Sequence, residues 1–195
     1  MNYVLLGLSW AVFYSLHSFL AATKIKRILE GKLGNAYKWY RLAYMLVLPF
    51  LFFGIMIQTL LIPNTFLMTK SALTDYLGYM IAGFGTIIAT KSYKKYSLKR
   101  FLEFTTAPLD EPLKTTGLYS KVRHPLYAGL ILIFLGYFLV AGTLSSAIHL
   151  GCLLLYLPFG IYFEEKNLVA QFGEAYQNYR SEVPALIPRF WKGRA

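Results

Sequence analysis

Five long apolar runs constrain this chain more than any other feature of its sequence. They occupy residues 3–22, 42–62, 73–90, 126–141 and 145–163. An α-helix rises about 1.5 Å per residue, so roughly 20 apolar residues cross the ~30 Å hydrocarbon layer of a bilayer. With 56% hydrophobic residues, the chain has more apolar surface than a soluble domain of 195 residues needs for its core. We therefore predict a single, all-α domain over residues 1–195: a polytopic membrane helix bundle with about five transmembrane helices.

The last two apolar runs are separated by a very short connection. Only Gly142, Thr143 and Leu144 lie between them. Connections of this length join helices that turn back on one another. The sequence therefore predicts a tight helical hairpin, whose open ends lie at the same membrane depth.

Positive charge is distributed unevenly among the loops. The net charge is +11, and 19 of the 20 Lys and Arg residues lie in residues 24–41, in residues 91–123 or after Glu165. Basic loops stay in the cytosol, so this bias predicts an N-terminus outside and a cytosolic C-terminus. The same side chains can face the anionic lipids of the bilayer. Because they are spread between apolar runs and form no contiguous basic surface, we expect no nucleic-acid partner.

Two cytosolic segments, residues 91–125 and 164–195, contain most of the polar side chains outside the apolar runs. We expect them to form the cofactor-binding part of the protein. Apolar side chains in the second segment follow one another at intervals of four, four and three residues, which predicts one amphipathic helix over residues 164–180. These side chains are Leu168, Phe172, Tyr176 and Tyr179. The pattern leaves open whether this helix lies along the membrane interface or covers a site below the bundle.

A polar sequence, TGLYSKVRHPLYAG, leads into the fourth apolar run at residues 116–129. Pro125 suits the first position of a helix, so Arg123 and His124 stand at the helix start. Free backbone N–H groups and the helix dipole favour a carboxylate or phosphate there. Tyr127 can add a hydroxyl group or an aromatic face. These residues alone also allow a simpler interpretation, in which Arg123 and His124 only anchor the helix at the headgroups.

Two adjacent carboxylates, Glu164 and Glu165, stand at the cytosolic end of the fifth apolar run. A helix C-terminus and an anionic leaflet both disfavour negative charge, so this pair needs partners. The predicted hairpin brings the pair close to Arg123, His124 and Tyr127. Such a site suits a zwitterionic sulfonium compound, although it also suits several other ligands. We expect no metal ion in it.

The sequence VRHPLYAG, followed about 35 residues later by EEKNLVAQFGEAYQNY and a VP, closely resembles the isoprenylcysteine carboxyl methyltransferases. Phospholipid N-methyltransferases share the pattern, and the resemblance covers roughly residues 105–188. It implies an S-adenosylmethionine-dependent integral membrane methyltransferase. It also implies that His124 and Tyr127 face the amino-acid end of the methyl donor, and that Glu164 and Glu165 face its ammonium group or ribose. The implied donor-binding residues are Leu118, Tyr119, Lys121, Arg123, His124, Pro125, Tyr127, Glu164 and Glu165.

The N-terminal half of the chain resembles other families. Trp10, His17-Ser18, Lys24 and Tyr40-Arg41-Leu42 are similar to positions in the NnrU family and in the membrane methanethiol S-methyltransferases. This likeness favours a thiol or another small apolar acceptor. The isoprenylcysteine enzymes have an Arg about one turn before the paired glutamates, where this chain has Gly160. This difference argues against methylation of a prenylated cysteine, although that carboxylate and a phospholipid amine remain candidate acceptors.

In-line methyl transfer depends mainly on holding the nucleophile, the methyl carbon and the sulfur collinear in a dry pocket. For an acceptor that must first lose a proton, the candidate bases and catalytic residues are Tyr127, Glu165 and His17. The acceptor is expected to enter from the lipid bilayer and the donor from the cytosol. The sequence does not indicate an oligomeric state.

Two alternative functions remain. A membrane sterol-type reductase shares an HPxYxG helix start but uses NADPH, and its typical HPNY sequence has Asn where this chain has Leu126. A non-enzymatic accessory protein would use the same charges only as interfacial anchors. Both alternatives predict a membrane helix bundle, so only ligand binding separates them from a methyltransferase.

Overall fold

The computed structural model describes residues 1–93 and 112–189, and all of the regular structure in these two ranges is helical. Contacts divide the chain into two compact units. The first unit comprises residues 1–70 and 141–156, and the second comprises residues 71–140 and 157–195. Part of the predicted cytosolic region, residues 94–111 and 190–195, lies outside the described residues.

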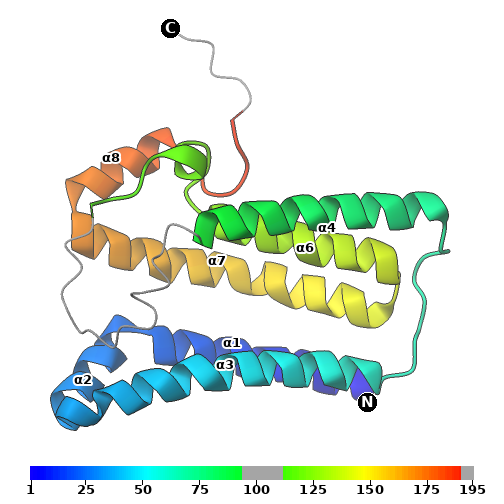
Figure 1. Cartoon of the computed structure of the whole chain (residues 1–195), viewed down its shortest axis with the longest axis horizontal. Coiled ribbons are helices and arrows are strands. Elements are labelled where there is room, and N and C mark those ends of the chain that lie inside the picture. Colours follow the sequence, from blue (N-terminus) through cyan, green and yellow to red (C-terminus); the bar gives the residue numbers. More distant parts are fainter. Residues whose placement is uncertain (94–111, 190–195) are drawn as a thin grey trace, which may run out of the picture. The chain divides into compact units, whose positions relative to one another are not determined.

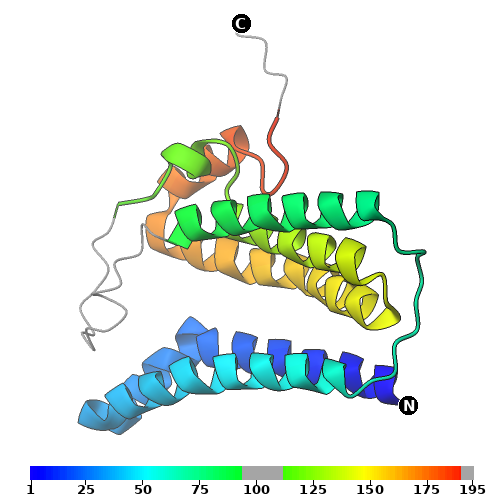
Figure 2. The ribbon, with the colours of Figure 1, turned by 45° about the vertical axis from the view of Figure 1, so that its right-hand side comes forward.

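The first unit is built on two long apolar helices, α1 (Asn2–Ala21) and α3 (Tyr37–Leu60). They lie side by side in Figures 1 and 2. Between them come α2 (Thr23–Leu33) and a short 3₁₀ turn, η1 (Gly34–Ala36). Gly34 ends α2 at φ +49°, a left-handed conformation that glycine adopts without steric cost.

A buried hydrogen-bond chain centred on His149 connects three helices within the first unit. The Trp10 indole donates to Nδ1 of His149 over 2.7 Å, and Nε2 lies 2.8 Å from the Thr59 hydroxyl. Thr59 in turn donates to the carbonyl of Ile55. Because an indole only donates, Nδ1 must accept, and the neutral ring carries its proton on Nε2. His149 is 0% exposed and both of its ring nitrogens are hydrogen-bonded, so its side chain connects α1 and α3 inside this unit.

The second unit contains α4 (Ala72–Tyr93), η2 (Gly117–Ser120), α6 (Pro125–Ala141) and α8 (Glu174–Glu182). α4 and α6 run side by side (Figures 1 and 2). Glycines let their backbones approach closely at two places. A Cβ atom on Gly85 would lie 2.7 Å from the Gly129 carbonyl oxygen, and one on Gly136 would lie 2.5 Å from that of Gly78. Such close approach is typical of packing between membrane helices.

The helix α7 (Leu144–Phe172) belongs to both units and has 29 residues, so it is about 43 Å long. It exceeds the hydrocarbon thickness and continues well past residue 163, the predicted end of the fifth span. The predicted single helix over residues 164–180 is therefore wrong. Its first half is the end of α7, Gly173 breaks the helix at φ +55°, and α8 begins at Glu174. A positive φ is strained for any residue with a side chain, so only a glycine suits this break, which the side-chain stripe alone did not reveal.

Four helices in the described part of the chain are long and apolar enough to cross a bilayer. Their candidate spans are Asn2–Leu20, Leu42–Leu60, Ala72–Ser92 and Leu144–Phe172. The fifth, α6, is strongly apolar but has 17 residues, close to the shortest length that spans a hydrocarbon core. These helices confirm the predicted fold class, a polytopic all-α bundle of a multi-pass membrane protein.

Candidate functional site

The sequence around Pro125 folds largely as its residues predicted. η2 is followed by a short turn, and α6 begins at Pro125, whose missing N–H costs nothing at a first helical position. The backbone N–H groups of Arg123 and His124 donate to the carbonyls of Pro184 and Ala185, over 2.8 and 2.9 Å. The chain after α8 therefore lies directly against the start of α6.

Arg123 connects three separate segments. Its Nη2 atom lies 2.6 Å from Oε1 of Glu165, and its Nε atom donates to the same oxygen over 2.8 Å. Nη1 donates to the backbone carbonyls of Arg180 and Val183 at the end of α8. The Arg123 side chain is only 10% exposed, so these charge-assisted bonds form in a partly desolvated setting where they are strong.

Glu165 is surrounded by positive charge. Besides Arg123, it contacts Nε2 of His124 at 3.1 Å and Nε of Arg180 at 3.1 Å. Its side chain is 6% exposed. Two guanidinium groups and an imidazole stabilise its ionised form, which makes Glu165 a poor proton acceptor. This geometry favours a positioning role for Glu165 over the base role suggested by the sequence.

His124 is buried between the two carboxylates, with 4% of its surface exposed. Its Nδ1 atom lies 3.4 Å from Oε2 of Glu164, and the Tyr127 ring stacks on the imidazole with a centroid distance of 5.6 Å. Burial lowers the pKa of His124, but Glu164 and Glu165 raise it by more, so the net pKa lies above its ordinary value. A protonated ring can bridge both carboxylates.

Glu164 is the more accessible carboxylate of the pair. Its side chain is 43% exposed, against 6% for Glu165. Its Oε2 atom is buried against Nδ1 of His124, so the exposed part of the carboxylate is the part that a ligand can reach. We call Arg123, His124, Glu164, Glu165 and Arg180 the charged cluster. In this cluster Glu164 retains acceptor capacity for a cationic ligand.

Two tyrosines of α8 pack beneath the charged cluster. Tyr176 and Tyr179 are 1% and 8% exposed, and their rings meet edge to face. The Tyr179 hydroxyl donates to the carbonyl of Tyr119 in η2 over 2.6 Å. Burial and the nearby Glu165 carboxylate raise the pKa of Tyr176 to about 12, and burial raises that of Tyr179 to about 12. Both phenols are therefore neutral near pH 7.

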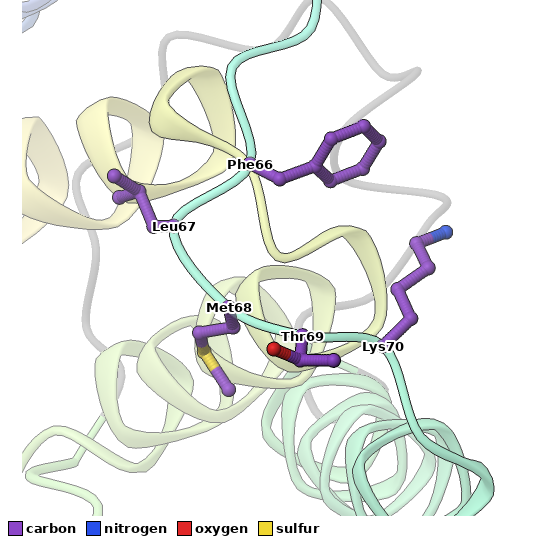
Figure 3. Close-up of a pocket in the computed structure, with 5 residues that line it drawn as sticks. All are labelled: Phe66, Leu67, Met68, Thr69 and Lys70. Carbon is purple, nitrogen blue, oxygen red and sulfur yellow. The ribbon is translucent and has the colours of Figure 1, made fainter.

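A groove of about 400 Å³ lies between η2 and α8. Its lining residues are Thr115, Ser120, Asn178, Tyr179, Glu182 and Val183. A second pocket, of about 490 Å³, lies along the loop of residues 66–70 in the first unit. Figure 3 shows the Phe66 ring and the Lys70 side chain extending to one side of that loop, with Leu67 on the other. Lys70 is the one charged residue that lines the loop pocket, and no cluster of polar side chains converges there, so we assign no site to it.

Comparison with known families adds to this geometry. The family model of the phospholipid methyltransferases matches residues 73–175, which is more than half of the chain and includes four of the five residues of the charged cluster. The chain belongs to this family. No solved structure matches it.

Several individual proteins that this phospholipid methyltransferase family member resembles are named as methyltransferases. Methanethiol S-methyltransferase 2 of Bradyrhizobium diazoefficiens is 34% identical over 122 residues, which cover 61% of this chain and 46% of that protein. Methanethiol S-methyltransferase of Crocosphaera subtropica is 43% identical over 75 residues, or 38% of this chain and 29% of that protein. Protein-S-isoprenylcysteine O-methyltransferase of Schizosaccharomyces pombe is 41% identical over 81 residues, or 40% and 34%. The chain thus spans less than half the length of these relatives.

The structure brings together most of the donor-binding residues predicted from the sequence. Arg123, His124, Glu164 and Glu165 contact one another, and Tyr127 stacks on His124. The remaining predicted residues adjoin them: Leu118 and Tyr119 in η2, Lys121 in the following turn, and Pro125 at the start of α6. Their roles toward a ligand stay predictions.

His17, the third predicted catalytic residue, lies in α1 of the first unit. Its ring stacks with that of Phe13, at a centroid distance of 6.3 Å, and meets the Tyr156 ring edge to face. Its catalytic role also stays a prediction.

Sequence reasoning missed Arg180 and the backbone of residues 183–185. The clue to Arg180 was its place in the EAYQNYR sequence, one residue after Tyr179 of the apolar stripe. Residues 183–185 are held by backbone hydrogen bonds, which do not depend on a side-chain pattern. The sequence therefore contains no motif that predicts their place in the site.

Proposed function

We propose that this chain is an S-adenosylmethionine-dependent integral membrane methyltransferase, with the charged cluster at its donor site. The observation that carries the proposal is the contact of Arg123 and His124 with Glu164 and Glu165, inside the region that matches the phospholipid methyltransferase family. The fold supplies a rigid frame for this contact, because one side comes from the start of α6 and the other from α7.

The residues present fit such a donor. The Glu164 side chain is 43% exposed, with its Oε2 atom facing His124, and a carboxylate has acceptor sites left over for the ammonium group of an amino acid. The Tyr127 ring, stacked on His124, offers an aromatic face that suits a sulfonium cation. When bound, the donor supplies an electrophilic methyl group on positively charged sulfur.

The other members of the charged cluster hold Glu164 in place. His124 bridges Glu164 and Glu165, and Arg123 and Arg180 fix Glu165 in turn. Each buried charge is thereby paired, which a low-dielectric site requires. Preorganised contacts of this kind cost no rearrangement when the ligand binds, so the cluster is suited to positioning.

We infer that the methyl acceptor is a small thiol. Several relatives are named as methanethiol S-methyltransferases, and Gly160 stands where a positive charge is expected in the isoprenylcysteine enzymes. A thiol reacts as its thiolate. The thiolate sulfur forms a bond to the methyl carbon while the donor's carbon–sulfur bond breaks, and the leaving sulfur keeps the electron pair and loses its charge. With Glu165 held by cations, Tyr127 remains the proposed acceptor of the thiol proton in the second unit.

The proposed orientation puts the charged cluster in the cytosol. The basic loops of residues 24–41 and 91–123 and the basic C-terminal segment all favour the cytosolic side. The donor would then enter from the cytosol, and an apolar acceptor from the bilayer. Labelling of single introduced cysteines in Cys152→Ser protein, with a membrane-impermeant reagent, tests this orientation.

A direct test uses purified full-length protein in detergent. We expect S-adenosylhomocysteine to bind, and Glu164→Gln to weaken its binding about tenfold or more, the loss expected for one charged hydrogen bond. Glu174→Gln is the matched control, because it removes the same charge at an exposed position outside the cluster. Membranes incubated with methyl-labelled S-adenosylmethionine and methanethiol should release a labelled volatile thioether. Binding of NADPH but not of S-adenosylhomocysteine would contradict the proposal.

A further inference from the structure

The groove between η2 and α8 has polar groups that the proposed methyl transfer does not use. Asn178 and Glu182 stand four residues apart on α8 and so share one face of that helix. Both side chains are exposed, and neither makes a side-chain hydrogen bond or ion pair within the described residues. The hydroxyl of Ser120, on the opposite wall, donates to the carbonyl of Gly117, and its oxygen can still accept.

This groove shares a wall with the charged cluster. Val183 lines the groove, and its carbonyl accepts a hydrogen bond from Nη1 of Arg123. Tyr179 also lines it, and its hydroxyl is fixed to the carbonyl of Tyr119. The groove therefore adjoins the charged cluster through Val183, a residue whose carbonyl Arg123 holds in place.

The chemistry of the groove selects among ligand fragments. A carboxylate accepts hydrogen bonds from the vicinal hydroxyls of a ribose, the way acidic residues hold ribose in dinucleotide-binding folds. A side-chain amide both donates and accepts, which matches the edge of a purine. The same carboxylate repels a phosphate group. At about 400 Å³ the groove is near the lower end of the range for small-molecule sites, so it suits a nucleoside better than a dinucleotide.

We propose that this groove binds the nucleoside half of the methyl donor, with Glu182 on the ribose hydroxyls and Asn178 on the adenine edge. The inference rests on the proposed function and adds a second subsite to it. Glu164 then binds the amino-acid end and Glu182 the sugar, so the two ends of the donor are held by different helices, α7 and α8.

The experiment compares two probes on the purified full-length protein: S-adenosylhomocysteine, and 5′-methylthioadenosine, which has the nucleoside but no amino-acid end. We expect Glu182→Gln and Asn178→Ala each to weaken binding of both probes about tenfold. We expect Glu164→Gln to weaken only S-adenosylhomocysteine. Glu174→Gln, on the same helix but outside the groove, should change neither affinity.

The outcomes separate the two proposals. If the wild-type protein binds both probes and Glu182→Gln and Asn178→Ala leave both affinities unchanged, the groove is ordinary solvated surface and this inference is overturned while the proposed function stands. If the wild-type protein binds neither probe, both proposals fail. Because Asn178 and Glu182 are exposed, the unfolding temperature without ligand should be unchanged in their variants, and that measurement shows that a lost affinity is not a lost fold.

Discussion

Oε1 of Glu165 accepts a hydrogen bond from Nε of Arg123 at 2.8 Å and lies 2.6 Å from Nη2 of the same guanidinium, although 42 residues separate the two. This ion pair connects the start of α6 with the last turns of α7, at the ends of the two helices that lie farthest along the chain from their short connection. Arg123 also reaches the carbonyls at the end of α8, so one side chain holds the start of α6, the end of α7 and the end of α8 together. The pair is therefore expected to contribute to stability as well as to ligand binding.

Glu165→Ala should destabilise the protein strongly. The change leaves Arg123 nearly buried without its counter-ion, and the loss of one partner from a buried ion pair costs about 3–5 kcal/mol. Thermal unfolding of the detergent-purified protein measures the effect. Glu174→Gln should cost less than about 1 kcal/mol, because that side chain is exposed and lies in the first turn of α8, where it interacts with the helix dipole. Equal losses in the two variants would contradict the role given to the Arg123–Glu165 pair.

The charged cluster should make stability depend on pH. Glu164 and Glu165 raise the pKa of His124 above its ordinary value of 6.5, so protonated His124 stabilises the folded state. This contribution is complete below pH 6.5 and is lost as the pH rises through the raised pKa. We expect the unfolding temperature to fall across that interval in the wild type. His124→Gln cannot titrate and should show a flatter profile, and an unchanged pH dependence in this variant would assign the effect to other groups.

Much of the fold follows from the apolar runs alone. The first and third runs, residues 3–22 and 73–90, agree with α1 and α4 to within a few residues. α3 begins at Tyr37, five residues before the second run, because polar and aromatic residues continue a helix as readily as apolar ones outside the bilayer. The split at Gly173 was missed for a related reason: the stripe of apolar residues continues across the glycine, and only its positive φ ends the helix.

The site was predictable where two short polar motifs flanked a hairpin. The short connection after α6 was enough to place His124 near Glu165, because antiparallel helices bring their open ends together. Arg180 and residues 183–185 were not predictable in this way. Their place depends on how the chain turns at Gly173 and returns to the start of α6, and that path is fixed by backbone hydrogen bonds.

Two neighbouring tyrosines of α8 should respond differently to loss of their hydroxyls. Tyr179→Phe removes the 2.6 Å hydrogen bond to the Tyr119 carbonyl and should cost about 1 kcal/mol. The Tyr176 hydroxyl is buried near the Arg123 guanidinium and makes no hydrogen bond of good geometry among the described residues. Because an unpaired buried hydroxyl is itself costly, Tyr176→Phe should be neutral or slightly stabilising. Thermal unfolding of both variants under one condition checks the difference, and a larger loss for Tyr176→Phe would show that its hydroxyl has a partner.

Because α4 packs closely against α6, we expect alanine substitutions at two glycines of α4 to have very different effects on the stability of the protein. A Cβ atom on Gly85 would lie 2.7 Å from the Gly129 carbonyl oxygen, whereas one on Gly83 would meet nothing within 4 Å. Gly85→Ala must push two helix backbones apart, and overpacking of this kind costs about 1–3 kcal/mol. Gly83→Ala should be neutral or stabilising by up to about 1 kcal/mol, because alanine is the better helix former.

The two α4 variants differ by position alone, so helix propensity cancels when their unfolding temperatures are compared. The start of α6 carries Arg123 and His124, so a shift of this helix should also disturb the charged cluster. Gly85→Ala is therefore expected to weaken S-adenosylhomocysteine binding as well as stability, whereas Gly83→Ala should leave both unchanged or slightly improved. Equal stability of the two variants would mean that α4 and α6 do not approach as closely as their glycines permit.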